Sequence, residues 1–130
     1  MSTIEGLKAL ADETRLRIVN VLEEADELCA CEIEAVLDLN QSNASRHLAK
    51  LRSAGIVDAA KEGHWVHYAL ARSARLAGIA VELLESLRGE RERFRGDLAR
   101  LHDYRTRGFT CETIGEWSAS HGSERHGRGE

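Results

Sequence analysis

The chain has 130 residues, a mass of 14.4 kDa and a formal net charge of −4, with 42% hydrophobic and 5% aromatic residues and no proline. This length predicts one domain, and the composition favours helices over a many-stranded sheet and excludes a uniformly basic nucleic-acid coat protein. The charge is uneven, because residues 1–39 carry three positive and ten negative side chains whereas residues 40–75 carry six and two, which predicts one basic face.

Four helices are predicted in the first half of the chain. Residues 3–12 have apolar side chains at helical spacing, and Asp12 is a suitable N-cap for a second helix. A short third helix is expected over residues 30–37. Asn40 can cap a fourth helix that ends before Gly55, a C-terminal glycine stop. This order is typical of a helix-turn-helix.

A β-hairpin is predicted directly after the fourth helix. Residues 56–61 and 64–70 flank the dipeptide Glu62-Gly63, which suits a two-residue turn. The fold class is therefore mainly α with a small β-hairpin, a winged helix-turn-helix.

A helical pattern resumes at about residue 73 and extends to about 105, where Gly89 and Gly96 leave one long helix or two helices equally open. Its apolar stripe is too long for so small a core, so we expect it to form a homodimer seam together with the first helix. Residues 1–107 are interpreted as the DNA-binding and dimerisation domain. Residues 108–130, rich in Gly, Ser, His and charge, are interpreted as a flexible tail.

No apolar run approaches the roughly 20 residues of a membrane helix, and the first residues lack the pattern of a signal peptide. We therefore expect a cytoplasmic protein without membrane association. Stable disulfides are rare in a reducing compartment, so clustered cysteines indicate metal binding or a reactive thiol.

The fourth helix has the pattern of a DNA-reading helix. Ala44, Leu48 and Leu51 share one face, as core packing requires, and the opposite face carries small or basic groups. Amide and guanidinium groups suit base edges, whereas Ser and Lys suit phosphates. The expected contacts to double-stranded operator DNA are Gln41, Ser42, Asn43, Ser45, Arg46 and Lys50 on the helix, with Lys61 and His64 at the hairpin turn. The alternatives are a solvated polar helix face and, at the turn, ordinary surface residues.

Four segments in order resemble the ArsR/SmtB family of dimeric metalloregulatory winged-helix repressors. They are Leu7-Lys-Ala-Leu-Ala-Asp-Glu-Thr-Arg-Leu-Arg-Ile, Glu27-Leu-Cys-Ala-Cys-Glu-Ile, Gln41-Ser-Asn-Ala-Ser-Arg-His-Leu-Ala-Lys-Leu-Arg-Ser-Ala-Gly-Ile-Val and Lys61-Glu-Gly-His-Trp-Val-His-Tyr. The resemblance covers about residues 3–88 and implies autoregulation of a resistance or efflux operon. It also implies a DNA contact for His47, which can equally be a structural histidine.

Cys29 and Cys31 lie where the third helix is expected to begin. In a regular helix, side chains two residues apart point in nearly opposite directions. At an irregular first turn, however, the two thiols can converge. A helix N-terminus favours thiolate, whereas the neighbouring glutamates oppose it. A soft thiophile such as As(III) can overcome this penalty.

The resemblance makes the thiol site more specific. Glu-Leu-Cys-x-Cys is a signature of the arsenic- and cadmium-sensing branches, and the arsenic pattern usually has a third cysteine where this chain has Glu34. We therefore expect Cys29, Cys31 and Cys111 to form a three-thiolate site for As(III) or Sb(III), with Cys111 from the same or the other subunit. Three alternatives stay open: Cd(II) or Zn(II) held by the pair and Glu34, a redox-sensing thiol pair, or inert cysteines.

An enzyme is the rival class, for example a small arsenate reductase or a thiol oxidoreductase. Such an enzyme needs a glycine-rich phosphate loop or a Cys-x-x-Cys redox turn, and the sequence has neither. We therefore expect a repressor and not an enzyme.

Overall fold

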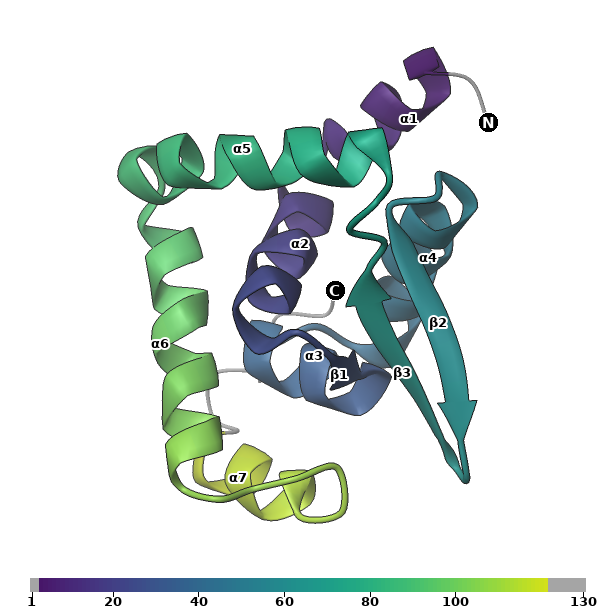
Figure 1. The fold of residues 1–130 in the computed structure, drawn as a ribbon. Coiled ribbons are helices and arrows are strands. Elements are labelled where there is room, and N and C mark those ends of the chain that lie inside the picture. The colour runs from purple at the N-terminus through teal and green to yellow at the C-terminus, as the bar shows by residue number, and fades with distance from the viewer. Residues whose placement is uncertain (1–2, 122–130) are drawn as a thin grey trace.

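The computed structural model describes residues 3–121. Figure 1 shows a mainly helical protein with a small sheet whose hairpin projects from one side. The helices are α1 (Thr3–Leu10), α2 (Glu13–Ala25), α3 (Ala30–Leu37), α4 (Gln41–Ser53), α5 (Arg75–Glu90), α6 (Glu92–Thr106) and α7 (Ile114–His121), and the strands are β1 (Leu28–Cys29), β2 (Val57–Glu62) and β3 (Trp65–Leu70). None of these helices is long and apolar enough to span a bilayer.

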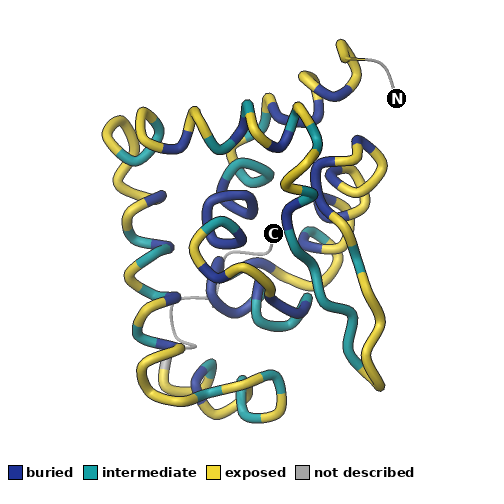
Figure 2. Tube along the Cα trace, in the orientation of Figure 1, coloured by how far each residue is buried: buried dark blue, intermediate teal, exposed yellow. Residues whose placement is uncertain are grey.

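The predicted helix-turn-helix is confirmed, with its caps. The Asp12 carboxylate accepts a hydrogen bond from the Arg15 N–H at 3.0 Å, and the Asn40 side chain accepts one from the Asn43 N–H at 2.8 Å. Each cap satisfies one of the unpaired donors at a helix start. Gly55 follows α4 with φ of +74°, a conformation that favours glycine. Figure 2 shows that buried residues are concentrated in α2 and α3, which form the centre of the core.

The wing is a three-stranded antiparallel sheet of order β1-β3-β2. Its hairpin turn lies one residue later than predicted, because Glu62 still pairs with Trp65 and Gly63 takes the positive φ of +62°. The short strand β1 is not predicted from its two residues. It forms because Leu28 and Cys29 pair with Tyr68 and His67 of β3.

The second half of the chain forms two helices, and neither candidate glycine marks the break. Arg91 adopts an extended conformation (φ −128°, ψ 119°), so that α6 turns away from α5 and runs down the side of the molecule (Figure 1). Phe94 and Leu101 are buried against α2 and α3 of their own chain. The expectation that this part of the stripe forms a dimer seam is therefore wrong, because the chain bends and buries it internally.

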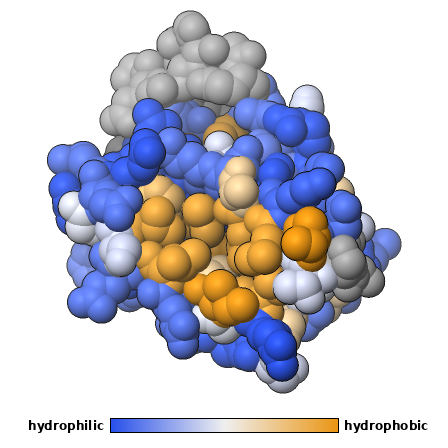
Figure 3. Space-filling model, turned by 90° about the horizontal axis from the view of Figure 1, so that it is seen from above, coloured by the Kyte–Doolittle hydropathy of each residue, from blue (hydrophilic) through white to orange (hydrophobic). Residues whose placement is uncertain are grey.

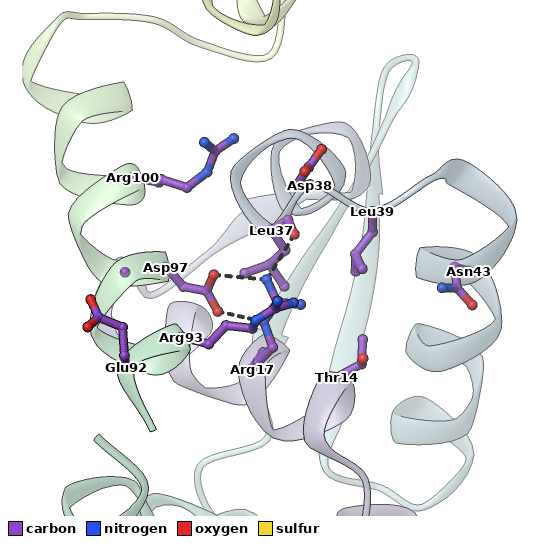
Figure 4. Close-up of a pocket in the computed structure, with 11 residues that line it drawn as sticks. Thr14, Arg17, Leu37, Asp38, Leu39, Asn43, Glu92, Arg93, Asp97 and Arg100 are labelled. Atoms are coloured by element: carbon purple, nitrogen blue, oxygen red, sulfur yellow. Dashed lines mark hydrogen bonds and ion pairs between the residues drawn. The ribbon is translucent and has the colours of Figure 1, made fainter. Parts of the chain in front are cut away.

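A buried ion pair fastens α6 to α2. The Arg17 guanidinium donates to both Asp97 carboxylate oxygens at 2.7 and 2.9 Å, and also to the Leu37 carbonyl at 2.9 Å (Figure 4). Loss of one partner of such a pair commonly lowers the free energy of unfolding by about 3–5 kcal/mol, because the other charge is left buried and unpaired. The pair adjoins a hollow of about 420 Å³ between α6 and the start of α4.

The segment after residue 107 also differs from the expected flexible tail. Residues Ile114–His121 form α7, and the Trp117 side chain is fully buried. Its indole N–H donates to Asp103 Oδ2 at 2.9 Å, and its ring contacts that of Tyr104 edge-on at a centroid distance of 5.4 Å. A buried tryptophan with a satisfied N–H anchors this part of the chain. Residues 122–130 of the expected tail lie outside the described residues.

An apolar patch remains on the face that carries α1 and α5. Figure 3 shows hydrophobic side chains gathered there, in the view from above. The exposed large hydrophobic residues are Ile4, Leu7 and Leu83. The two helices are in close contact, since a Cβ on Gly6 would overlap the Leu76 side chain.

Candidate nucleic-acid interface and thiol site

Helix α4 presents one polar face to solvent. Its core side is made by Ala44, Leu48 and Leu51, which are buried against the helix-turn-helix. The predicted contacts Gln41, Ser42, Ser45, Arg46 and Lys50 are exposed, and Asn43 is half-buried. The start of the helix is free of acidic residues and its last turn is basic, which suits approach to phosphates.

Arg46 is positioned by its own helix. Its Nη2 donates to Asn43 Oδ1 at 2.6 Å, one turn earlier. This contact occupies part of the Asn43 amide and holds the guanidinium at the exposed start of the helix. A guanidinium fixed there can donate two parallel hydrogen bonds to a guanine edge or a phosphate.

His47 is not on the DNA-facing surface. Its side chain is buried, with 4% exposure, and Nδ1 lies 3.0 Å from Arg15 Nη1. Because arginine can only donate, Nδ1 must accept, and the ring is neutral in this contact. Burial lowers the pKa of His47, although the nearby Asp12 opposes this shift. The expected DNA contact is therefore corrected to a structural role that joins α4 to α2.

The wing carries the other two expected contacts. Lys61 lies near the end of β2 and His64 lies in the turn, and both are exposed. The hairpin projects beyond the body of the molecule in Figure 1, so these residues can reach DNA beside α4.

Cys29 and Cys31 converge at the start of α3. Cys29 ends β1 and is also the N-cap of α3, with extended φ and ψ of −80° and 164°. This irregular first turn brings the two Sγ atoms to 3.0 Å. Cys29 is buried and Cys31 half-buried, and both thiols are free.

Cys111 reaches the same place from the other end of the chain. It lies in the connection between α6 and α7, which is held by the buried Trp117 and by stacking of Phe109 on Tyr104 at a centroid distance of 6.3 Å. The Sγ atoms of Cys29, Cys31 and Cys111 all lie within 4.8 Å of one another in one chain. Glu34, the alternative ligand, is not a member of this group.

Glu32 and Tyr104 border the thiols. Glu32 is one of the glutamates expected to oppose thiolate formation, but its two hydrogen bonds and the presence of Tyr104 were not predicted from the sequence. Glu32 Oε1 accepts from the Cys29 N–H at 2.8 Å, and Oε2 accepts from the Tyr104 hydroxyl at 2.6 Å. The position of Glu32, three residues after the N-cap, is the signal that could have identified it, because it is that of a capping box. No local pattern indicates Tyr104, which lies 72 residues later.

Burial raises the pKa of the Cys29 thiol, with further increases from hydrogen bonds to the other two cysteines. Burial likewise raises the pKa of Cys111, to about 11, and the nearby Glu32 and Cys31 add to this increase. Two of the three sulfurs are therefore thiols at neutral pH, and a ligand must displace their protons. A hollow of about 570 Å³, lined by Cys111, Tyr104 and Phe109 among others, opens Cys111 to solvent, whereas Cys29 and Cys31 do not line it.

A DNA-reading helix, a supporting helix and a hairpin wing define a winged helix-turn-helix DNA-binding protein. Residues 12–59 match the bacterial regulatory proteins of the arsR family. The arsenical resistance operon repressor of Escherichia coli (strain K12) is 45% identical over 91 residues, or 69% of this chain and 76% of that protein. The cadmium resistance transcriptional regulatory protein CadC of Listeria innocua is 44% identical over 61 residues, or 47% of this chain and 51% of that protein.

A solved structure is also similar. It is the homodimeric winged helix-turn-helix DNA-binding domain of a possible ArsR-family transcriptional regulator from Mycobacterium bovis. It matches with a TM-score of 0.57 and 30% identity, over 67% of this chain and 78% of that chain. The chain belongs to the ArsR family of transcriptional regulators. This membership confirms the predicted family and the expectation of a regulator rather than an enzyme.

Proposed function

We propose that the protein is a homodimeric repressor of an operon for resistance to metalloids. In this proposal α4 and the wing bind double-stranded operator DNA, and As(III) or Sb(III) releases it by binding Cys29, Cys31 and Cys111. The observation that carries the proposal is the group of three free thiols within 4.8 Å of one another at the first turn of α3, the helix that precedes α4. The E. coli relative, an arsenical resistance operon repressor, supports the same inducer class.

The donor set suits a trivalent metalloid. Thiolates are soft ligands and favour soft, thiophilic ions. Arsenous acid, As(OH)₃, can exchange its three hydroxides for three thiols and release three waters, so that each thiol proton leaves with a hydroxide. Neutral, buried thiols such as Cys29 therefore do not prevent binding.

Helix α3 can transmit binding to α4. Its first turn carries Cys29 and Cys31, and its last carbonyls are held by Arg100, which donates to Val36 O at 2.8 Å and Ala35 O at 3.0 Å. Asp38, in the left-handed conformation, then leads into the N-cap of α4. A ligand that bonds to the three thiols fixes their separations and acts on a helix held at both ends, and any displacement of α3 moves the start of α4. Such coupling is typically worth about 1–3 kcal/mol, or 5–150-fold in DNA affinity.

A homodimer would cover the apolar patch on α1 and α5. Exposed apolar patches on a small protein commonly mark interaction sites. The exposed Ile4, Leu7 and Leu83 would be buried there, and the M. bovis neighbour is a homodimer. Two copies related by a twofold axis would present two α4 helices about one duplex turn apart.

The test is fluorescence anisotropy of a labelled duplex from the promoter of the protein's own gene, titrated with arsenite. We expect arsenite to release the wild-type protein from the duplex. C29S, C31S and C111S should bind DNA normally and require at least tenfold more arsenite for release, because each lacks one ligand. T110S is the matched control from the loop of Cys111 and should respond like the wild type.

Release of all three serine variants at the wild-type arsenite concentration would contradict the proposal. Parallel titrations with Sb(III), Cd(II), Zn(II) and an oxidant separate the other inducers. Release by Cd(II) but not by arsenite would instead indicate a cadmium-responsive repressor, as the Listeria relative is named. Release by oxidant alone would indicate a thiol redox switch.

A further inference from the structure

A second group of metal-ligating side chains lies beside the wing and comes from three segments of the chain. Glu27 precedes β1, Glu62 ends β2 and His67 lies on β3, and one ligand atom from each falls within 4.8 Å of the others. His67 pairs directly with Cys29 across the β1–β3 ladder. The group shares no residue with the three thiols, although Glu27 and His67 line the same hollow as Cys111.

The imidazole of His67 lies between the two carboxylates. Nδ1 is 3.5 Å from Glu27 Oε2, and Nε2 is 3.5 Å from Glu62 Oε1. A neutral imidazole has one N–H and can donate to only one of them. One ion binds only one nitrogen of an imidazole, so these two separations do not belong to a single coordination sphere. The one ligand atom taken from each of the three side chains lies within 4.8 Å of the other two, against roughly 3.4 Å between ligands of a tetrahedral Zn(II) with bonds of about 2.0–2.1 Å. One carboxylate must therefore turn toward the ring nitrogen that the other already contacts.

We propose that Glu27, Glu62 and His67 bind a divalent first-row cation, with Zn(II) as the ion that this donor set suits best. Imidazole nitrogen and carboxylate oxygen are ordinary Zn(II) ligands, and a water can complete the site. A cation between the carboxylates also offsets their mutual repulsion. The Glu62 and Glu27 side chains are 67% and 52% exposed, so the ion can enter from solvent and the carboxylates have room to turn toward it.

Binding there would join the wing to the body of the protein. Glu27 belongs to the connection after α2, whereas Glu62 and His67 belong to the two strands of the hairpin. A bound cation would restrict the hairpin and neutralise a carboxylate adjacent to Lys61, an expected DNA contact. The site is thus placed to modulate the wing without using the thiols.

The test uses the full chain with all three cysteines replaced by serine, titrated with Zn(II) while ¹H–¹⁵N spectra of the imidazoles are recorded. The His67 signals are assigned with H67Q. We expect them to shift at Zn(II) concentrations at least tenfold lower than those that shift His102, an exposed histidine on α6. If serine at the buried Cys29 disturbs folding, a second thiol-free protein with alanine in place of all three cysteines is used instead.

E27Q and E62Q should each raise the half-saturating Zn(II) concentration at His67 at least tenfold, because each removes one ligand while changing an exposed residue. E112Q is the matched control, since Glu112 is also exposed and lines the same hollow as Glu27 and His67 but is not a member of the group. Equal shifts of His67 and His102, or no effect of E27Q and E62Q, would overturn the proposal. None of these outcomes depends on whether arsenite binds the cysteines.

Discussion

Arg46 is the side chain on α4 best placed to read DNA. It is exposed at the start of the helix, and its hydrogen bond to Asn43 reduces the conformational freedom that binding would have to restrict. We expect R46A to weaken promoter binding at least tenfold, about 1.4 kcal/mol, without changing the melting temperature by more than a few degrees.

Anisotropy at fixed salt measures this loss. The control is R107A, which removes the same charge from an exposed site at the end of α6. Near-normal binding by R46A, or an equal loss in R107A, would exclude a specific contact by Arg46.

His47 gives α4 a pH dependence of stability. Because burial holds its folded-state pKa below the unfolded value of about 6.5, the unfolded chain binds the proton more readily. The stabilisation by neutral His47 is therefore complete above pH 6.5 and is lost as the pH falls through and below that value. We expect H47Q, whose amide oxygen can still accept from Arg15, to lose less stability than the wild type between pH 7.5 and 5.5 in urea denaturation. Parallel losses in the two proteins would contradict this account.

At the scale of single elements, α7 holds Cys111 in place. Trp117 is fully buried, and its contacts with Asp103 and Tyr104 fix the connection that carries the third thiol. We expect W117A to lower the free energy of unfolding by up to about 3–5 kcal/mol. If α7 detaches while the rest of the chain stays folded, the loss is no larger than the free energy that holds α7 in place. Alkylation followed by mass spectrometry should then show faster modification of Cys111 and unchanged modification of Cys29.

W117F keeps an aromatic ring at this position and should retain most of the protection. If Cys111 reacts at the same rate in W117A and in the wild type, α7 does not position the thiol.

Elements with local signals were predictable from the sequence. Asp12, Asn40 and Gly55 mark helix ends by interactions within a few residues, and the structure confirms all three. Strand β1 and helix α7 were not predictable in this way, since each forms through distant partners. The bend at Arg91 has no glycine or proline, and it is set by burial of the α6 stripe against α2 and α3.

The residues of the candidate site also divide into those with a local sequence signal and those brought together by distant contacts. The adjacent Cys29 and Cys31 were recognisable by their spacing, whereas Cys111 was inferred only because it is the remaining thiol. Glu32 and Tyr104 meet across 72 residues, a contact that no local pattern encodes.

At the scale of the whole molecule, one chain carries both candidate sites. The fold-back of α6 and α7 brings Cys111 to the thiol pair, so the three sulfurs of the candidate site lie in the same chain, and the apolar α1–α5 face stays exposed. In the proposed homodimer there are then two separate inducer sites, each beside the helix that supports its own α4.

The central claim is that arsenic binds three sulfurs of one chain. X-ray absorption at the arsenic edge of the arsenite-loaded protein tests it most directly. We predict three As–S contacts and no As–O contact in the wild type, and two sulfurs with one oxygen in C111S. Two sulfurs in the wild type, or a spectrum that C111S leaves unchanged, would contradict the claim.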